Sequence, residues 1–88
     1  MIVKYRKRFL KELSSLPPKI RTRIEQFVFR ELPEMNSISQ SGHIEKMHGY
    51  DGYYKVRFGA YRVGSYYKED VIMLERVLHR RDIYKFFP

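Results

Sequence analysis

The chain has 88 residues, with 18 Lys and Arg against 10 Asp and Glu, a net charge of +8 and a pI near 9.9. This length predicts one small domain, residues 1–88, and the basic excess favours a polyanionic partner, with nucleic acid ahead of acidic protein or anionic membrane. The absence of cysteine excludes disulfides and thiolate chemistry, and we expect no metal or cofactor. No long apolar run or leader pattern occurs, so we expect a cytoplasmic protein without membrane contact.

The first third of the chain is predicted to hold a short strand and two helices. Residues 2–5 are the strand, and residues 6–16 form a helix in which apolar side chains recur at helical spacing. Pro17-Pro18 ends this helix and can open the next, because proline fits a first helical turn. The second helix carries an apolar stripe and should end near Leu32, since the residue before Pro33 is pushed out of the α region.

The two helices should form a hairpin with one apolar face, which needs a sheet to cover it. Lys19, Arg21 and Arg23 fall on the outer face of the hairpin. They are either an ordinary solvated surface or a surface that binds RNA substrate through counterion release.

The remainder of the chain is predicted to be mostly strands. Residues 44–47 alternate like a strand, and three further strands cover about 53–58, 61–68 and 71–79. Residues 82–87 suit a single helical turn or an extended tail. Its apolar side chains, Ile83, Phe86 and Phe87, are expected to pack back onto the body.

Gly59-Ala60 is predicted to be a two-residue hairpin loop, because Gly in the first position suits a type II′ turn. Arg57 would then pair with Arg62, and Lys55 would share their face of the sheet. Like charges directly opposite one another are destabilising. Such a pair predicts an anionic ligand, and a phosphate chain fits best.

A second turn is expected at Glu69-Asp70. If its loop also has two residues, Glu75 and His79 lie on the same face as Arg62, and an odd-length loop would reverse this.

Two stretches, YYKVRFGAYRVG and RVLHRRDIYKFFP, follow the helices in an order and spacing that resemble the RelE/ParE toxin superfamily of bacteria and archaea. The resemblance spans essentially the whole chain. It implies an α+β fold, with an N-terminal helical hairpin packed on a small twisted, mainly antiparallel sheet, related to microbial ribonucleases.

The RelE branch of the superfamily implies a ribosome-dependent endoribonuclease that cuts mRNA in the A site and so inhibits translation. It also implies a co-expressed acidic, RelB-like antitoxin that holds the toxin inactive. Two alternatives stay open: a ParE-like gyrase poison, and a non-catalytic domain that binds RNA or the ribosome.

The resemblance places the family's cationic pair on Lys55 and Arg57 and its sheet arginine on Arg62. Its C-terminal arginine and tyrosine fall on Arg80 and Tyr84. Arg57 stands where the best-studied pattern has lysine, and the spacing from Arg80 to Tyr84 is shorter than in that pattern. Arg81, expected to bind substrate, can therefore exchange roles with Arg80.

Cleavage by the RNA 2′-hydroxyl needs a base, stabilisation of the phosphorane and an acid for the leaving oxygen. Lys55, flanked by arginines that grip the phosphate, is the first candidate base, and Glu75 is the second.

For the acid the sequence offers His79 or Arg80. The imidazole is the better proton donor, although a polar residue at a strand end can instead cap neighbouring backbone. Tyr84 can stack on a base or orient the nucleophile.

Overall fold

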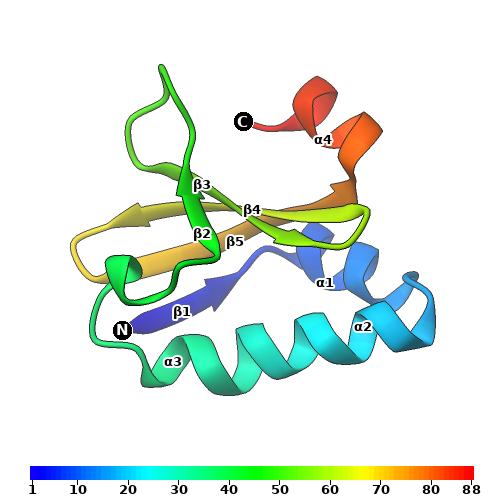
Figure 1. Ribbon diagram of the computed structural model, residues 1–88, viewed down its shortest axis with the longest axis horizontal. Coiled ribbons are helices and arrows are strands. Elements are labelled where there is room, and N and C mark those ends of the chain that lie inside the picture. Colours follow the sequence, from blue (N-terminus) through cyan, green and yellow to red (C-terminus); the bar gives the residue numbers. More distant parts are fainter.

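The computed structural model describes residues 1–88 as one five-stranded sheet with helices on both of its faces (Figure 1). The strands are β1 (Ile2–Tyr5), β2 (Ile44–Lys46), β3 (Tyr53–Phe58), β4 (Tyr61–Lys68) and β5 (Val71–His79). The helical segments are α1 (Lys7–Ser14), α2 (Pro18–Glu25), η1 (Gln26–Glu31), α3 (Leu32–Glu34), η2 (Ile38–Gln40) and α4 (Arg80–Phe86).

The strands lie in the order β1-β5-β4-β3-β2. All neighbouring pairs are antiparallel except β1 and β5, which run parallel. The helices carry the chain from β1 at one edge of the sheet to β2 at the other edge. The predicted α+β class with a mainly antiparallel sheet is confirmed. Four of the predicted strands have the observed bounds, and β2 is one residue shorter.

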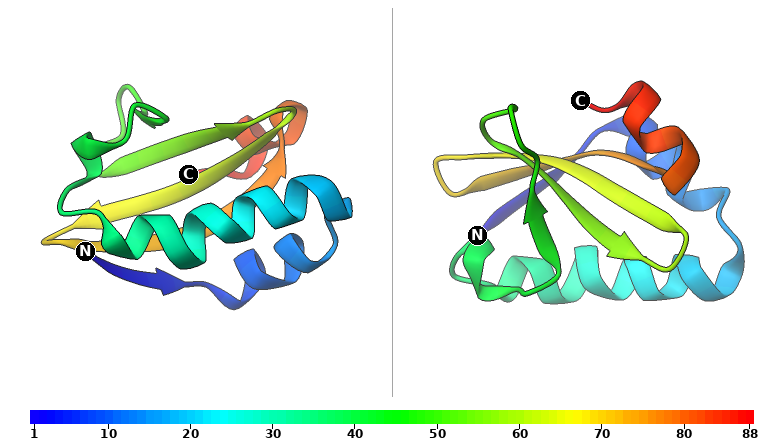
Figure 2. Two further views of the ribbon diagram at one scale, coloured as in Figure 1. Left: turned by 60° about the horizontal axis from the view of Figure 1, so that its bottom comes forward. Right: turned by 45° about the horizontal axis from the view of Figure 1, so that its top comes forward.

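One face of the sheet is covered by α1 and by the long helix made of α2, η1 and α3 (Figure 2). The sequence folds this way because both helices are apolar on one side only and bury that side against the strands. No helix of the chain has the length and apolarity that crossing a membrane requires. Buried in this main core are Phe9, Leu13, Ile24, Phe27, Val28, Leu32, Val56, Val63, Ile72, Leu74 and Val77.

The long helix does not end near Leu32, as the sequence predicted, but continues to Glu34. A π-helical segment, η1, ends at Glu31, two residues before Pro33. In a regular α-helix the proline ring would meet the carbonyl of Phe29, and a wider turn relieves that clash. The prediction was wrong because a proline can be accommodated where the preceding turn widens.

The other face of the sheet carries α4, a seven-residue helix rather than the predicted single turn or tail. Ile83 and Phe87 are buried there with Met47. A Cβ atom on Gly64 would lie 2.6 Å from the Phe87 ring, so the absence of a side chain at this position lets the ring rest on β4. Phe86 was also expected to pack inward, but it is 58% exposed.

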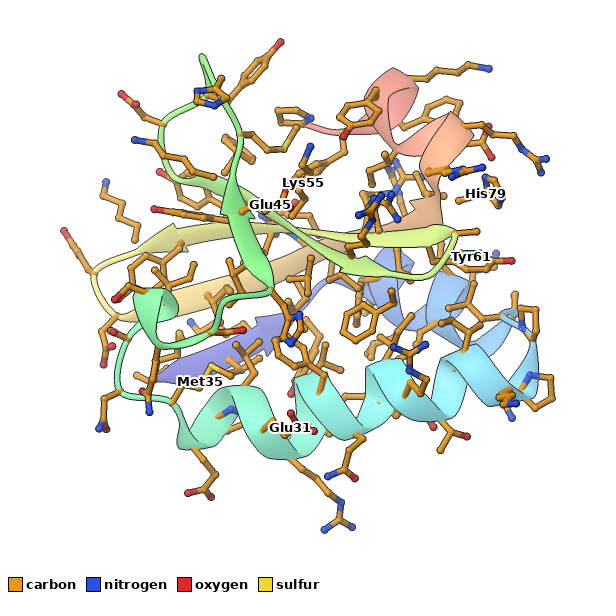
Figure 3. The ribbon with its side chains drawn as sticks, in the orientation of Figure 1. Glu31, Met35, Glu45, Lys55, Tyr61 and His79 are labelled. Atoms are coloured by element: carbon orange, nitrogen blue, oxygen red, sulfur yellow. The ribbon has the colours of Figure 1, made fainter.

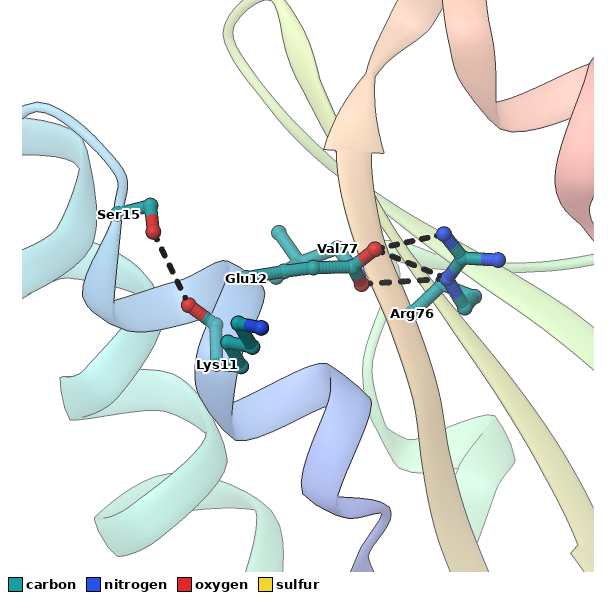
Figure 4. A network of polar contacts seen from close by, with 5 residues as sticks. All are labelled: Lys11, Glu12, Ser15, Arg76 and Val77. Atoms are coloured by element: carbon teal, nitrogen blue, oxygen red, sulfur yellow. Dashed lines mark hydrogen bonds and ion pairs between the residues drawn. The ribbon is translucent and has the colours of Figure 1, made fainter.

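The free edge of β5 is closed by a side chain from α1. The carboxylate of Glu12 accepts hydrogen bonds from Arg76 Nη2 at 2.6 Å, from Arg76 Nε at 3.0 Å and from the backbone N–H of Val77 at 3.1 Å (Figure 4). This contact supplies an acceptor to a strand N–H that β1 is too short to reach. It also fixes α1 against the sheet.

A candidate anion-binding site on the second face of the sheet

The β3–β4 hairpin has the predicted register. Arg57 lies opposite Arg62, and Val56 lies opposite Val63. Gly59 has a φ of +56°, and the residue after it is not in the left-handed region, as a type II′ turn requires. The two arginines therefore lie directly across from each other, as the sequence predicted.

Lys55, Arg57 and Arg62 share the face of the sheet that carries α4, while the alternate residues enter the main core. With Glu45 of β2 and Tyr84 of α4, these three cations line a cleft of about 190 Å³. Figure 3 shows Glu45 and Lys55 at β2 and β3, on the side of the sheet toward α4. Residues from four elements thus meet in one small polar hollow.

Arg62 is the most enclosed cation of the cleft, at 8% exposure. Its Nη1 donates to the carbonyl of Gly59 at 2.8 Å and to that of Tyr61 at 2.9 Å, which ties the side chain to the hairpin loop. No carboxylate lies within ion-pair distance of it. A buried charge without a counterion is costly, so this guanidinium is suited to an anion that enters the cleft.

Lys55 is held between an aromatic hydroxyl and a carboxylate. Its Nζ donates to Tyr84 Oη at 2.5 Å and lies 4.8 Å from the centre of that ring. On the other side it lies 4.0 Å from Glu45 Oε2, across the β2–β3 pair. The cleft therefore brings a carboxylate, an ammonium and a phenol together.

The predicted placement of His79 on the face of Arg62 is wrong, and Glu75, which was predicted on the same face, does not line the cleft. The turn at Glu69-Asp70 does have two residues, but β5 carries one extra residue, Glu75, where the register shifts opposite Gly64 and Ser65. A bulge of this kind moves every later side chain to the other face. Arg62 consequently lies opposite Leu78.

Glu75 and His79 each have a different partner. Glu75 is paired with Arg6, whose Nε lies 3.3 Å from the carboxylate. His79 caps α4, because its Nδ1 accepts a hydrogen bond from the backbone N–H of Arg81 at 3.2 Å. The imidazole packs edge-on against Tyr61, away from Lys55 (Figure 3). The sequence left two roles open for His79, proton donor or backbone cap, and the structure shows the capping contact.

The two arginines of α4 differ in position. Arg80 begins the helix and is exposed, and it shares the helical face of Tyr84 because the two stand four residues apart. Arg81 lies 3.6 Å from Asp82 and borders another hollow, of about 560 Å³, together with His79. Neither arginine lines the cleft of Lys55, and Arg80 lies one helical turn before Tyr84, which does.

The helical cations that were predicted to bind substrate are dispersed. Lys19 is exposed, and Arg21 donates to the carbonyl of Ser14 at 3.4 Å, at the end of α1. Arg23 borders a hollow of about 130 Å³ that Arg57 also lines. Arg23 is thus connected to the cleft only through Arg57, which lines both hollows.

Glu45 is the lining residue that the sequence reasoning missed. The alternation of Ile44 and Glu45 in a predicted strand indicates that Glu45 faces away from the core, but not which strand it pairs with. Its position opposite Lys55 follows from the β2–β3 register. No three His, Asp or Glu side chains of the chain come together as metal ligands.

Comparison with known proteins gives consistent matches over nearly the whole chain. Residues 3–84 match the family described as the ParE toxin of the type II toxin–antitoxin system parDE. The chain is 40% identical to Toxin RelE3 of Methanocaldococcus jannaschii over 89 residues, which covers 100% of both.

Solved structures give the same result. The RelB–RelE antitoxin–toxin complex from Methanococcus jannaschii matches with a TM-score of 0.80 and 39% identity, over 97% of this chain and 99% of that one. The archaeal RelE–RelB complex from Pyrococcus horikoshii matches with a TM-score of 0.67 and 28% identity, over 90% and 93%. The isolated RelE toxin of E. coli, at 15% identity and a TM-score of 0.67 over 98% of each chain, shares the fold.

Proposed function

Because the chain belongs to the RelE/ParE superfamily and is a RelE-type toxin of a type II toxin–antitoxin system, we propose that it is a ribosome-dependent endoribonuclease that cleaves mRNA in the A site. The proposed site is the cleft of Lys55, Arg57, Arg62 and Tyr84. The observation that carries the proposal is Arg62, a buried guanidinium without a carboxylate partner, beside two further cations.

The cleft suits a phosphodiester in chemical terms. Arginine pairs with phosphate oxygens through two parallel hydrogen bonds, and Arg57 and Arg62 lie directly opposite each other across one strand pair. Lys55 adds a third positive charge against the phosphorane that forms when the 2′-hydroxyl attacks. The Tyr84 ring, 60% exposed, offers a surface on which a base can stack.

The ribosome supplies what the cleft lacks. The lining of five residues is too small to hold more than one phosphate and its sugar. A ribosome would fix the mRNA backbone in the geometry of attack, and a basic surface that includes Arg23, Arg80 and Arg81 would dock on ribosomal RNA. The net charge of +8 supports such docking.

The partner that restrains this toxin is proposed to be an acidic, RelB-like antitoxin. The similar toxins from Methanococcus jannaschii and Pyrococcus horikoshii were solved as complexes with RelB. A negatively charged segment that folds on binding would neutralise part of the basic surface of the toxin.

A ParE-like gyrase poison is the other function within this superfamily. The ParDE structure from P. aeruginosa shares the fold, with a TM-score of 0.58 and 11% identity, well below the values for the archaeal RelB–RelE complex. A binding poison also has no need of a phosphate cleft.

Primer extension on one mRNA, incubated with purified toxin with and without ribosomes, tests the proposal. We expect codon-spaced cuts only when ribosomes are present, and about 100-fold slower cutting by Lys55→Met. Lys68→Met removes an exposed lysine from the far end of β4 and is the matched control. Intact mRNA under all conditions, together with a DNA-damage response in cells, would instead favour the gyrase poison.

A further inference from the structure

We infer that Glu45 is the proton acceptor of the site, the group that takes the proton of the attacking 2′-hydroxyl. This inference rests on the proposed ribonuclease function. Glu45 belongs to β2, whereas the cations of the cleft, Lys55, Arg57 and Arg62, belong to β3 and β4.

Glu45 is the only carboxylate that lines the cleft. A negative charge weakens phosphate binding, so a site that only bound RNA would be better without it. A site that cleaves RNA needs a group able to accept a proton, and an ionised carboxylate is such a group. The Glu45 side chain is 61% exposed, which leaves it accessible to a bound nucleotide.

The other candidate acceptors are occupied or lie elsewhere. Glu75, the bulged residue of β5, is paired with Arg6, and the Nδ1 of His79 accepts a hydrogen bond from the backbone N–H of Arg81. Lys55 acts as a donor in the structure, because its Nζ donates to Tyr84 Oη. Proton transfer from the ribose to Glu45 requires none of these contacts to break.

The position of Glu45 matches the geometry of the reaction. Its Oε2 lies 4.0 Å from Lys55 Nζ, and Glu45 pairs with Lys55 across β2 and β3 in the lining of the cleft. For a phosphate held by Lys55 and the two arginines, Glu45 is the nearest carboxylate of the lining, and the inference requires that the attacking ribose lies toward β2. The carboxylate and the ammonium would then flank the nucleophile and the phosphorus.

In the step itself the 2′-oxygen bonds to phosphorus as its proton moves to Glu45, and the bond from phosphorus to the 5′-oxygen breaks. The leaving 5′-oxygen takes a proton from water, and the products are a 2′,3′-cyclic phosphate and a 5′-hydroxyl end. Glu45 returns its proton to water, so no oxidant or other co-reactant is consumed.

The test compares Glu45→Gln with wild type in single-turnover cleavage on ribosomes that carry one defined mRNA, at saturating toxin. Glutamine keeps the shape and a hydrogen-bonding oxygen but does not act as a base. We expect the cleavage rate to fall about 100-fold or more, while binding to the ribosome is unchanged or tighter. Glu34→Gln, which removes an exposed carboxylate from α3, is the matched control and should cleave like wild type.

The variants Lys55→Met and Glu45→Asp separate the possible outcomes. If Glu45→Gln cleaves within about 3-fold of wild type while Lys55→Met is slow, Glu45 is only an ion-pair partner and the inference is overturned, with the ribonuclease intact. A slow Glu45→Gln with partial rescue by Glu45→Asp supports it. If wild type leaves the mRNA whole, the proposed function fails and the inference fails with it. Thermal unfolding of each variant verifies that the edge strand still folds.

Discussion

The hydroxyl of Tyr84 accepts a hydrogen bond from the ammonium of Lys55 at 2.5 Å, and the same ring lies 4.8 Å from that nitrogen. Helix α4 is thereby joined to the middle of β3. This contact connects the packing of α4 to the state of the cleft, because whatever displaces the helix also releases Lys55.

Tyr84→Phe should separate the hydrogen bond from the ring contact. The variant keeps the aromatic face over Lys55 but loses the acceptor, and we expect single-turnover cleavage to slow about 10-fold, equivalent to about 1.4 kcal/mol in the barrier. Tyr84→Ala loses both contacts and should be slower still. Equal rates for the Phe variant and wild type would mean that the hydroxyl has no part in the reaction.

Gly64→Ala tests how α4 is held. The added methyl group would lie 2.6 to 2.8 Å from three atoms of the Phe87 ring and would push it off β4. We expect a loss of about 1–3 kcal/mol in the free energy of unfolding, measured with denaturant, and slower cleavage because Tyr84 moves with the helix. Gly42→Ala has open space around its Cβ and is the control. Similar losses in both variants would show that Phe87 is not anchored this way.

Glu12→Ala should be the most destabilising of the acidic substitutions. It leaves the guanidinium of Arg76 and the N–H of Val77 without their acceptor at a partly buried position, and we expect a loss of about 2–3 kcal/mol. Glu75→Ala breaks a pair with Arg6, whose side chain is 57% exposed, and should cost less than about 1 kcal/mol. Chemical denaturation of the two variants gives the comparison, and a reversed order would contradict it.

We expect the effect of Tyr5→Phe on the free energy of unfolding to depend on pH in the alkaline range. Burial raises the pKa of Tyr5 above its ordinary value of 10.0, and its hydroxyl donates to the carbonyl of Val28. The unfolded chain therefore ionises first, so the stability that this hydroxyl contributes is complete below about pH 10 and is lost as the pH rises further. The variant should be about 1 kcal/mol less stable at pH 8.

The gap in unfolding free energy between wild type and Tyr5→Phe should narrow above about pH 10. Tyr50→Phe, at a side chain that is 53% exposed, controls for the loss of a phenol elsewhere on the surface. A gap that stays constant from pH 8 to the onset of alkaline unfolding would be inconsistent with a buried Tyr5 hydroxyl.

Much of the sheet could be predicted because local rules act strongly there. Alternation marked the strands, Gly59 fixed a two-residue turn, and the pairing of Arg57 with Arg62 followed from it. The extra residue at Glu75 left no such trace in the sequence, because a bulge depends on how two strands meet and not on either strand alone. The misplacement of His79 came from this one register shift.

The missed part of the site has a similar cause. Glu45 lies on a three-residue strand whose partner is set by the loop before β3, so its approach to Lys55 is a tertiary outcome. The resemblance to RelE toxins predicted that Tyr84 lies with Lys55, Arg57 and Arg62, and the structure brings the four together, whereas spacing along the chain could not predict this. Phe86 and Phe87 were indistinguishable by composition, and only the bare backbone at Gly64 decides which one is buried.

The pairing of β1 with β5 has a consequence for the time at which this toxin becomes dangerous to the cell that makes it. Residues 2–5 can pair only after residues 71–74 have been made, and Lys55 can bind Tyr84 only after that residue has been made. Neither the sheet nor the cleft can therefore form while the ribosome is still adding β5. We therefore expect a nascent chain, or one truncated before residue 84, to lack a complete cleft and to be inactive. The toxin can act only after its own translation has passed the last residue of the site.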